Sequence, residues 1–127
     1  MATILVMDDD AYMRELIGLH LSKAGYDVLV AEDAIVAGHL VLQKSPDLIL
    51  ADIEMPFMNG LEFVQAFKAD PSVSHTPVIF VSSRDDLEEL AKSFGATAFL
   101  KKPVLADRLL AAVAQEIGAG TAIPIRP

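Results

Sequence analysis

Three aspartates in succession end a short apolar run near the start of the chain: Asp8, Asp9 and Asp10 follow the sequence ILVM. Neighbouring carboxylates repel one another, and a bound cation would remove that repulsion. Oxygen ligands of this kind suit a hard divalent cation such as Mg2+, so the cluster indicates a magnesium site. The same residues could instead cap the helix that follows, because carboxylates are favoured at a helix N-terminus. We prefer the cap for Asp10 and leave both interpretations open for Asp8 and Asp9.

More polar side chains stand at the ends of later apolar runs. Asp52 follows the third run, Ser82 and Ser83 close the fourth, and Lys101 and Lys102 close the fifth. In an open parallel sheet, ligands bind beyond the carboxyl ends of the strands. We therefore expect these groups to meet the aspartates at one edge of a sheet.

The elements that must hold these residues alternate between strand and helix. Short apolar runs predict five strands, at residues 2–7, 27–31, 47–51, 77–82 and 97–100. Between them apolar residues recur at three- and four-residue steps, as in 11–24, which Gly25 ends, and in 105–117. Three of the strands are apolar at consecutive positions, which indicates that helices cover both faces of a parallel sheet. The pattern predicts a doubly wound α/β domain.

The composition limits the possible functions. The chain has 127 residues, enough for one domain, and a formal net charge of -8. An acidic protein without a basic patch repels nucleic acid and anionic membranes, so we expect neither as a partner. The absence of cysteine excludes disulfides and thiolate metal sites, and no apolar stretch approaches the ~20 residues of a membrane span. We expect a soluble, cytoplasmic protein with a complete N-terminus.

Four segments, in this order and spacing, resemble the receiver domain of bacterial two-component response regulators: ILVMDDD, DLILADIEMPFMNG, VIFVSS and FLKKP. Each segment alone is weak evidence, but together they are specific, and the resemblance covers residues 3–117. It implies a flavodoxin-like, five-stranded parallel sheet of strand order 2-1-3-4-5 with five helices. Residues 1–117 would form the receiver domain. Residues 118–127, where helical periodicity is lost, would be a C-terminal tail or a truncated linker.

The resemblance also implies a phosphorylation site. Asp52 would accept a phosphoryl group from a sensor histidine kinase or a phosphotransfer protein, while Lys102 and Mg2+ neutralise the charge on the transferring oxygens. Asp9 and Asp52 would bind the metal directly, and the main-chain carbonyl of Glu54 would be a third ligand. Asp8 would hold a metal-bound water.

Activation would move two further residues. By the resemblance, Ser82 is the switch hydroxyl, which would donate to a phosphoryl oxygen, and Phe99 is the aromatic switch residue. A downstream target would bind the face made by helix 4, strand 5 and helix 5. Simpler explanations are a turn residue for Ser82, ordinary core for Phe99 and a solvated strand end for Lys101. Threonine is more frequent in the family at the position of Ser82, so the switch is expected to be looser.

Other positions complete the implied pattern. Glu54 and Arg84 occupy positions that in the family tune loss of the phosphoryl group, and the direction of their effect is open. In the segment MPFMNG, Pro56 and Gly60 would fix a sharp loop, with the two methionines packed beneath it. The peptide bond between Lys102 and Pro103 is expected to be cis, as is usual in the family.

An enzyme is the alternative function. Magnesium-dependent phosphohydrolases of the haloacid dehalogenase type also use an aspartate nucleophile, placed as DxD after the first strand, and Asp8 and Asp10 have that spacing. No cap insertion is present, however, and Asp52 would go unexplained. A flavodoxin-like FMN binder is disfavoured because three carboxylates would repel its phosphate. We therefore expect a signalling module that catalyses only its own phosphoryl transfer and slow dephosphorylation.

The predicted helix at 33–45 is unusual because it is apolar nearly all round, although an outer helix should have a polar face. If Ala37 and Val41 face the sheet, Ile35 and Leu42 share a stripe that points elsewhere. Scattered exposed apolar residues are normal. The alternative is a constitutive contact surface for another chain, for example in a homodimer.

Overall fold

The computed structural model describes residues 2–54, 60–71, 73 and 75–121. Within them, five strands form one parallel sheet of order β2-β1-β3-β4-β5. The strands are β1 (Thr3–Met7), β2 (Asp27–Ala31), β3 (Leu48–Asp52), β4 (Val78–Ser82) and β5 (Ala98–Lys101). The helices are α1 (Ala11–Lys23), α2 (Ala34–Lys44), α3 (Gly60–Lys68), α4 (Leu87–Phe94) and α5 (Ala106–Thr121). The predicted fold class and strand order are confirmed.

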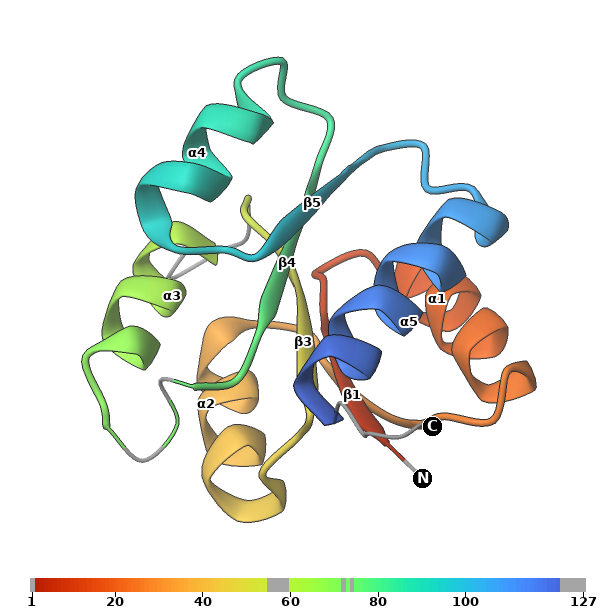
Figure 1. Cartoon of the computed structure of the whole chain (residues 1–127), viewed down its shortest axis with the longest axis horizontal. Helices are drawn as coiled ribbons and strands as arrows, with labels where there is room; N and C mark the ends of the chain where they lie inside the picture. Colours follow the sequence, from red (N-terminus) through yellow and green to blue (C-terminus); the bar gives the residue numbers. More distant parts are fainter. Residues whose placement is uncertain (1, 55–59, 72, 74, 122–127) are drawn as a thin grey trace.

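Helices cover both faces of the sheet, with α2, α3 and α4 on one side and α1 and α5 on the other (Figure 1). Successive side chains of a strand point to opposite faces. Leu5, Ile49 and Phe80 therefore join one buried cluster with the first group of helices. Their neighbours Ile4 and Leu50 join a second cluster with α1 and α5. The central strands β3 and β4 are buried at every position, as their consecutive apolar residues predict.

Short polar side chains and glycines set the ends of the helices. The Asp10 side chain accepts a hydrogen bond from the Tyr12 amide at 2.9 Å, so Asp10 caps α1 as predicted. Asp33 caps α2 in the same manner through the Val36 amide. After α4 the backbone turns at Gly95 with φ of 81°, a left-handed conformation that glycine adopts without a steric penalty. These turns return the chain to the start of the next strand.

Several element boundaries differ from the sequence-based expectation, most of them by one residue. Helix α5 continues to Thr121, past the predicted end at residue 117, because glycine inside a helix costs only about 1 kcal/mol relative to alanine. Strands β3 and β5 each end one residue later than predicted, at Asp52 and Lys101. The predicted packing of the MPFMNG methionines lies outside the described residues. No helix in the described ranges combines the length and hydropathy needed to cross a membrane.

Candidate functional site

The site is built at the carboxyl edge of the sheet, where neighbouring strands end side by side. Asp8 directly follows β1, and Asp52 is the last residue of β3. In the strand register Asp52 pairs with Val81 of β4, and the next residue, Ser82, pairs with Lys101 of β5. Because all strands run in the same direction, these polar residues from four strands reach one edge, as the sequence predicts.

The three predicted acidic residues do come together. Carboxylate oxygens of Asp8, Asp9 and Asp52 all lie within 4.8 Å of one another. Asp8 and Asp52 are buried, whereas Asp9 is exposed to solvent. The cluster therefore has a buried floor and an open rim. It is the single group of three or more acidic, histidine or cysteine side chains with this spacing in the part of the chain that the structure describes.

Lys102 places its ammonium group against the buried floor. Its Nζ lies 3.4 Å from Oδ2 of Asp8 and 3.4 Å from Oδ2 of Asp52. The other oxygen of each carboxylate accepts a main-chain amide: Asp8 Oδ1 from Asp10 at 2.9 Å, and Asp52 Oδ1 from Glu54 at 3.0 Å. Each buried carboxylate is thus fixed on one side by the backbone and turned on the other side toward Lys102.

The electrostatics of the site follow from this burial. Desolvation raises the pKa of Asp52 to about 6; the Glu54 amide opposes the shift, and the neighbouring Asp8 carboxylate adds to it. For Lys102, burial disfavours the ammonium form, but the Asp52 and Asp8 carboxylates outweigh burial and raise its pKa above the usual value. In the folded protein the ionised form of Asp52 is therefore less favoured, relative to the protonated form, than it is in water.

The donor set fits a divalent cation such as Mg2+. Three carboxylates and one ammonium leave two negative charges in excess, which one divalent cation would balance. Mg2+ prefers oxygen ligands, is bound through one or two carboxylates and retains several waters. The exposed position of Asp9 leaves room for water at the open rim.

The predicted switch hydroxyl lies beside this cluster. Ser82 is buried at the end of β4, and its Oγ accepts a hydrogen bond from the Arg84 amide at 3.1 Å. The Lys102 amide donates to the Ser82 carbonyl at 2.9 Å, which ties the ends of β4 and β5 together. The Ser82 side chain, like that of Asp52, is thus held by a hydrogen bond from a main-chain amide.

Three further predictions have a structural outcome. Phe99 is not plain core: the residue is 41% exposed on β5, which is an edge strand of the sheet formed by the described residues. Lys101 is exposed, as expected, but its Nζ also forms a 2.7 Å ion pair with Asp85. The peptide bond between Lys102 and Pro103 is cis, as expected.

Sequence reasoning missed one contact of the site. Arg14, one turn into α1, donates through Nη1 to the main-chain carbonyl of Asp8 at 2.7 Å. The carbonyl lies six residues before Arg14, so no local sequence signal pointed to this contact. On the rim, Arg84 forms a bidentate pair with Asp86, and its Nη1 lies 3.9 Å from Glu54 Oε2. These residues connect the loops after β3 and β4.

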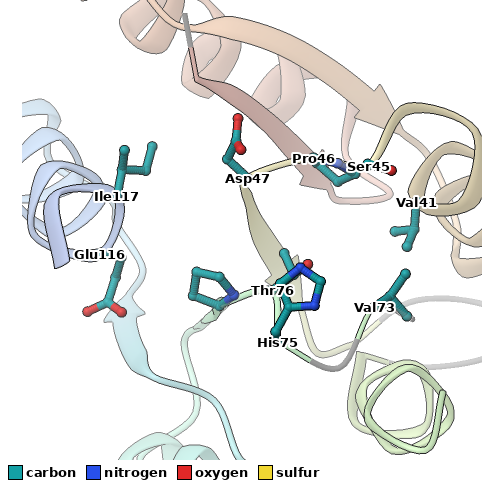
Figure 2. A pocket seen from close by; sticks show the side chains of 10 residues that line it. Val41, Ser45, Pro46, Asp47, Val73, His75, Thr76, Glu116 and Ile117 are labelled. Carbon is teal, nitrogen blue, oxygen red and sulfur yellow. The ribbon is translucent and has the colours of Figure 1, made fainter. Parts of the chain in front are cut away.

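A hollow lies elsewhere on the molecule (Figure 2). It measures about 300 Å3 and is lined by residues that precede β3 and β4, including Asp47 and Thr76, together with Glu116 and Ile117 of α5. These residues belong to the amino edge of the sheet, opposite the acidic cluster. The hollow is therefore separate from the candidate site.

Comparisons with known proteins agree with the geometry. The model of the response regulator receiver domain matches residues 4–114. The DNA-binding dual master transcriptional regulator RpaA of Synechocystis sp. is 33% identical over 115 residues, which make up 89% of this chain and 48% of that protein. The phosphate regulon regulatory protein PhoB of Pseudomonas aeruginosa is 32% identical over 123 residues, 93% of this chain and 54% of that protein. The chain thus spans about half the length of these curated relatives.

Solved structures give the same result. Chemotaxis response regulator CheY4 of Vibrio cholerae superposes with a TM-score of 0.86 and 31% identity, covering 91% of this chain and 98% of that one. The receiver domain of Francisella response regulator 1452 has a TM-score of 0.88 and 27% identity, covering 95% and 100% of the two chains. Fold, acidic cluster and sequence similarity agree, and the chain belongs to the response regulator receiver domain family.

Proposed function

We propose that the chain is a phosphorylation-activated signalling switch in which Asp52 receives a phosphoryl group from a sensor histidine kinase or a phosphotransfer protein. The observation that supports this most directly is the position of Asp52. Its buried carboxylate has one oxygen fixed by the Glu54 amide and the other directed at Lys102, beside two further aspartates. A carboxylate so placed has one oxygen that is not bound by the backbone and can attack, with the Lys102 ammonium next to it.

In the proposed transfer, Oδ2 of Asp52 attacks the phosphorus of a donor phosphohistidine. An acyl phosphate bond forms, the phosphorus–nitrogen bond breaks, and the nitrogen keeps the electron pair of that bond. Lys102 stabilises the negative charge of the phosphoryl oxygens. Asp9, Asp52 and the main-chain carbonyl of Glu54 would hold Mg2+, with Asp8 holding a metal-bound water, and the bound ion would add positive charge next to those oxygens.

The signal would leave the site through Ser82. The Oγ of Ser82 accepts from the Arg84 amide, and a hydroxyl that accepts one bond can still donate one, here to a phosphoryl oxygen. That new bond would draw the loop after β4 toward Asp52. Phe99, exposed on the adjacent strand, would turn into the space left behind, and the face made by α4, β5 and α5 would change shape for a downstream target protein.

Two similar proteins, RpaA and PhoB, are DNA-binding or transcriptional regulators about twice as long as this chain. In our proposal this domain supplies the phosphorylation-dependent part of such signalling and contacts a protein target. Its formal net charge of -8 disfavours direct contact with nucleic acid.

The test is phosphorylation by a small acyl phosphate in the presence of Mg2+, followed by intact mass spectrometry. The wild type should gain one phosphoryl group and Asp52→Asn none, whereas the control Asp27→Asn, at an exposed aspartate of β2, should be labelled like the wild type. Labelling of Asp52→Asn at a comparable rate would refute the assignment. A magnesium-dependent phosphohydrolase, the alternative, would instead release phosphate over many turnovers without accumulating a phosphorylated chain.

A further inference from the structure

The main-chain carbonyl of Asp8 is bound by an arginine side chain. Strand β1 ends at Met7, so this carbonyl lies just beyond the strand. Nη1 of Arg14 donates to it at 2.7 Å, at the short end of the range for such bonds and as expected for a charged donor. Arg14 is half-buried, so the contact is partly shielded from water. The loop between β1 and α1 is thus closed by a side chain of the helix that follows it.

The stability of α1 does not explain an arginine at this position. Arg14 is the fourth residue of α1, in the first turn, where the positive end of the helix dipole disfavours a cation. The start of the helix is capped by Asp10, whose side chain accepts from the Tyr12 amide and whose carbonyl accepts from the Arg14 amide. The guanidinium group therefore serves the loop before the helix.

The carbonyl that Arg14 binds belongs to the peptide group that joins Asp8 to Asp9. A peptide group is planar, so holding its oxygen also fixes the direction in which the chain enters Asp9. The buried carboxylate of Asp8 has its own contacts, with the Asp10 amide at 2.9 Å and the Lys102 ammonium group at 3.4 Å. Asp9 is exposed, so packing does not hold its side chain. Its direction depends on the backbone that Arg14 holds.

We propose that Arg14 is a positioning residue of the metal site: by holding the peptide group before Asp9, it directs that carboxylate toward Asp52. This role rests on the proposed binding of Mg2+ by the acidic cluster. Carboxylate oxygens of Asp9 and Asp52 lie within 4.8 Å of each other. Mg2+ demands near-ideal geometry, and ligands that are ordered in advance lose less conformational freedom on binding. The arginine therefore raises the affinity of the cluster for the cation.

Charge and positioning give opposite signs for the removal of Arg14. If Arg14 acted only as a positive charge near the cluster, it would repel Mg2+, and its removal would tighten binding. As a positioning residue it favours binding, so its removal weakens binding. Loss of a residue that orients a metal ligand typically costs about 10- to 100-fold in metal affinity. We expect a loss at the lower end of that range for Arg14→Met, because the cluster keeps all its carboxylates.

Titration calorimetry with Mg2+ alone, without a phosphoryl donor, tests the proposal. Arg14→Met should bind Mg2+ about tenfold more weakly than the wild type. Arg108→Met is the matched control, because it removes the same charge from an exposed position on α5 and should bind like the wild type. Unchanged or tighter binding by Arg14→Met, or equal weakening in the control, would overturn the proposal.

Backbone 15N relaxation of the metal-free protein separates positioning from a general loss of structure. In Arg14→Met the order parameters of the Asp9 and Asp10 amides should fall, while those of β4 stay at their wild-type values. Unchanged order at Asp9, or an equal fall throughout β4, would overturn the proposal.

Phosphorylation is measured separately, so that the two proposals can fail independently. At saturating Mg2+, Arg14→Met should be labelled at the wild-type rate, with the Mg2+ concentration for half the maximal rate raised about tenfold. A wild type that binds Mg2+ but is not labelled would refute the role of Asp52 and leave that of Arg14 intact. A wild type that is labelled, with Arg14→Met binding Mg2+ equally well, would refute the role of Arg14 alone.

Discussion

The raised pKa of Asp52 predicts that removing its charge stabilises the metal-free protein. Asp52 is 5% exposed, and its carboxyl has a pKa of about 6 instead of 3.8. A carboxyl with a higher pKa in the folded state binds its proton more tightly there. The contribution of this carboxyl to the stability of the folded state is therefore complete below pH 3.8. It is lost as pH rises from there through about 6. Multiplied by 1.36 kcal/mol per unit, the difference gives a penalty of about 3 kcal/mol at pH 8.

Asp52→Asn abolishes this titration and should make the metal-free protein more stable by about 2–3 kcal/mol at pH 8. The advantage should shrink as pH falls through about 6 and should largely vanish near the ordinary carboxyl pKa of 3.8. Urea unfolding in chelator at each pH measures the free energy of unfolding. Asp27→Asn, which removes an exposed charge, should change it by less than about 0.5 kcal/mol at any pH.

Two results would refute this reasoning. A stability gain that is the same at pH 4 and pH 8 would mean that it does not come from ionisation of Asp52. A variant less stable than the wild type at pH 8 would mean that the attraction to Lys102 exceeds the cost of burial.

Three further predictions concern the neighbours of Asp52. Mg2+ should raise the melting temperature of the wild type, with about 2.7 kcal/mol of added stability at a concentration 100 times the Kd. Asp9→Asn should be slightly more stable than the wild type without metal, and its melting temperature should rise much less when Mg2+ is added. An unchanged response to Mg2+, measured by calorimetry during a magnesium titration, would exclude Asp9 as a ligand. Lys102→Met leaves the buried carboxylates of Asp8 and Asp52 without a cation next to them. Urea unfolding at pH 8 should show the metal-free variant to be less stable than the wild type by about 1–2 kcal/mol. Equal stability would show that the ion pairs of Lys102 contribute nothing. Asp10→Ala removes the cap of α1 and should cost about 1 kcal/mol, whereas Asp10→Asn should stay near the wild type; equal loss in both would point to charge and not to capping.

The strands and the ends of the first two helices were predictable because their signals are local. A run such as ILVM in β1 is apolar at every position only where both faces are covered, and Asp10 and Asp33 are short polar residues at helix starts. The arrival of Asp8 and Asp52 at one edge also followed from the parallel direction of the strands.

Distances and exposures could not be predicted in the same way. The equal 3.4 Å reach of Lys102 to two carboxylates depends on the path of the chain after β5, and the pKa of Asp52 depends on burial by the whole fold. The exposure of Phe99 depends on which face of β5 its side chain occupies. Arg14 has no partner next to it in sequence, because the carbonyl that it binds lies six residues earlier.

The sheet divides the interior into two separate compartments, and this has a consequence for local opening. Phe80 and Ile79 are neighbours in β4, yet they pack with different helices on opposite sides. The helices on one face of the sheet can open locally while the hydrophobic cluster on the other face stays packed against the strands. Amide hydrogen exchange under native conditions should then resolve two cooperative units, α1 with α5 and α2 with α3 and α4, each opening at a lower free energy than β3 and β4.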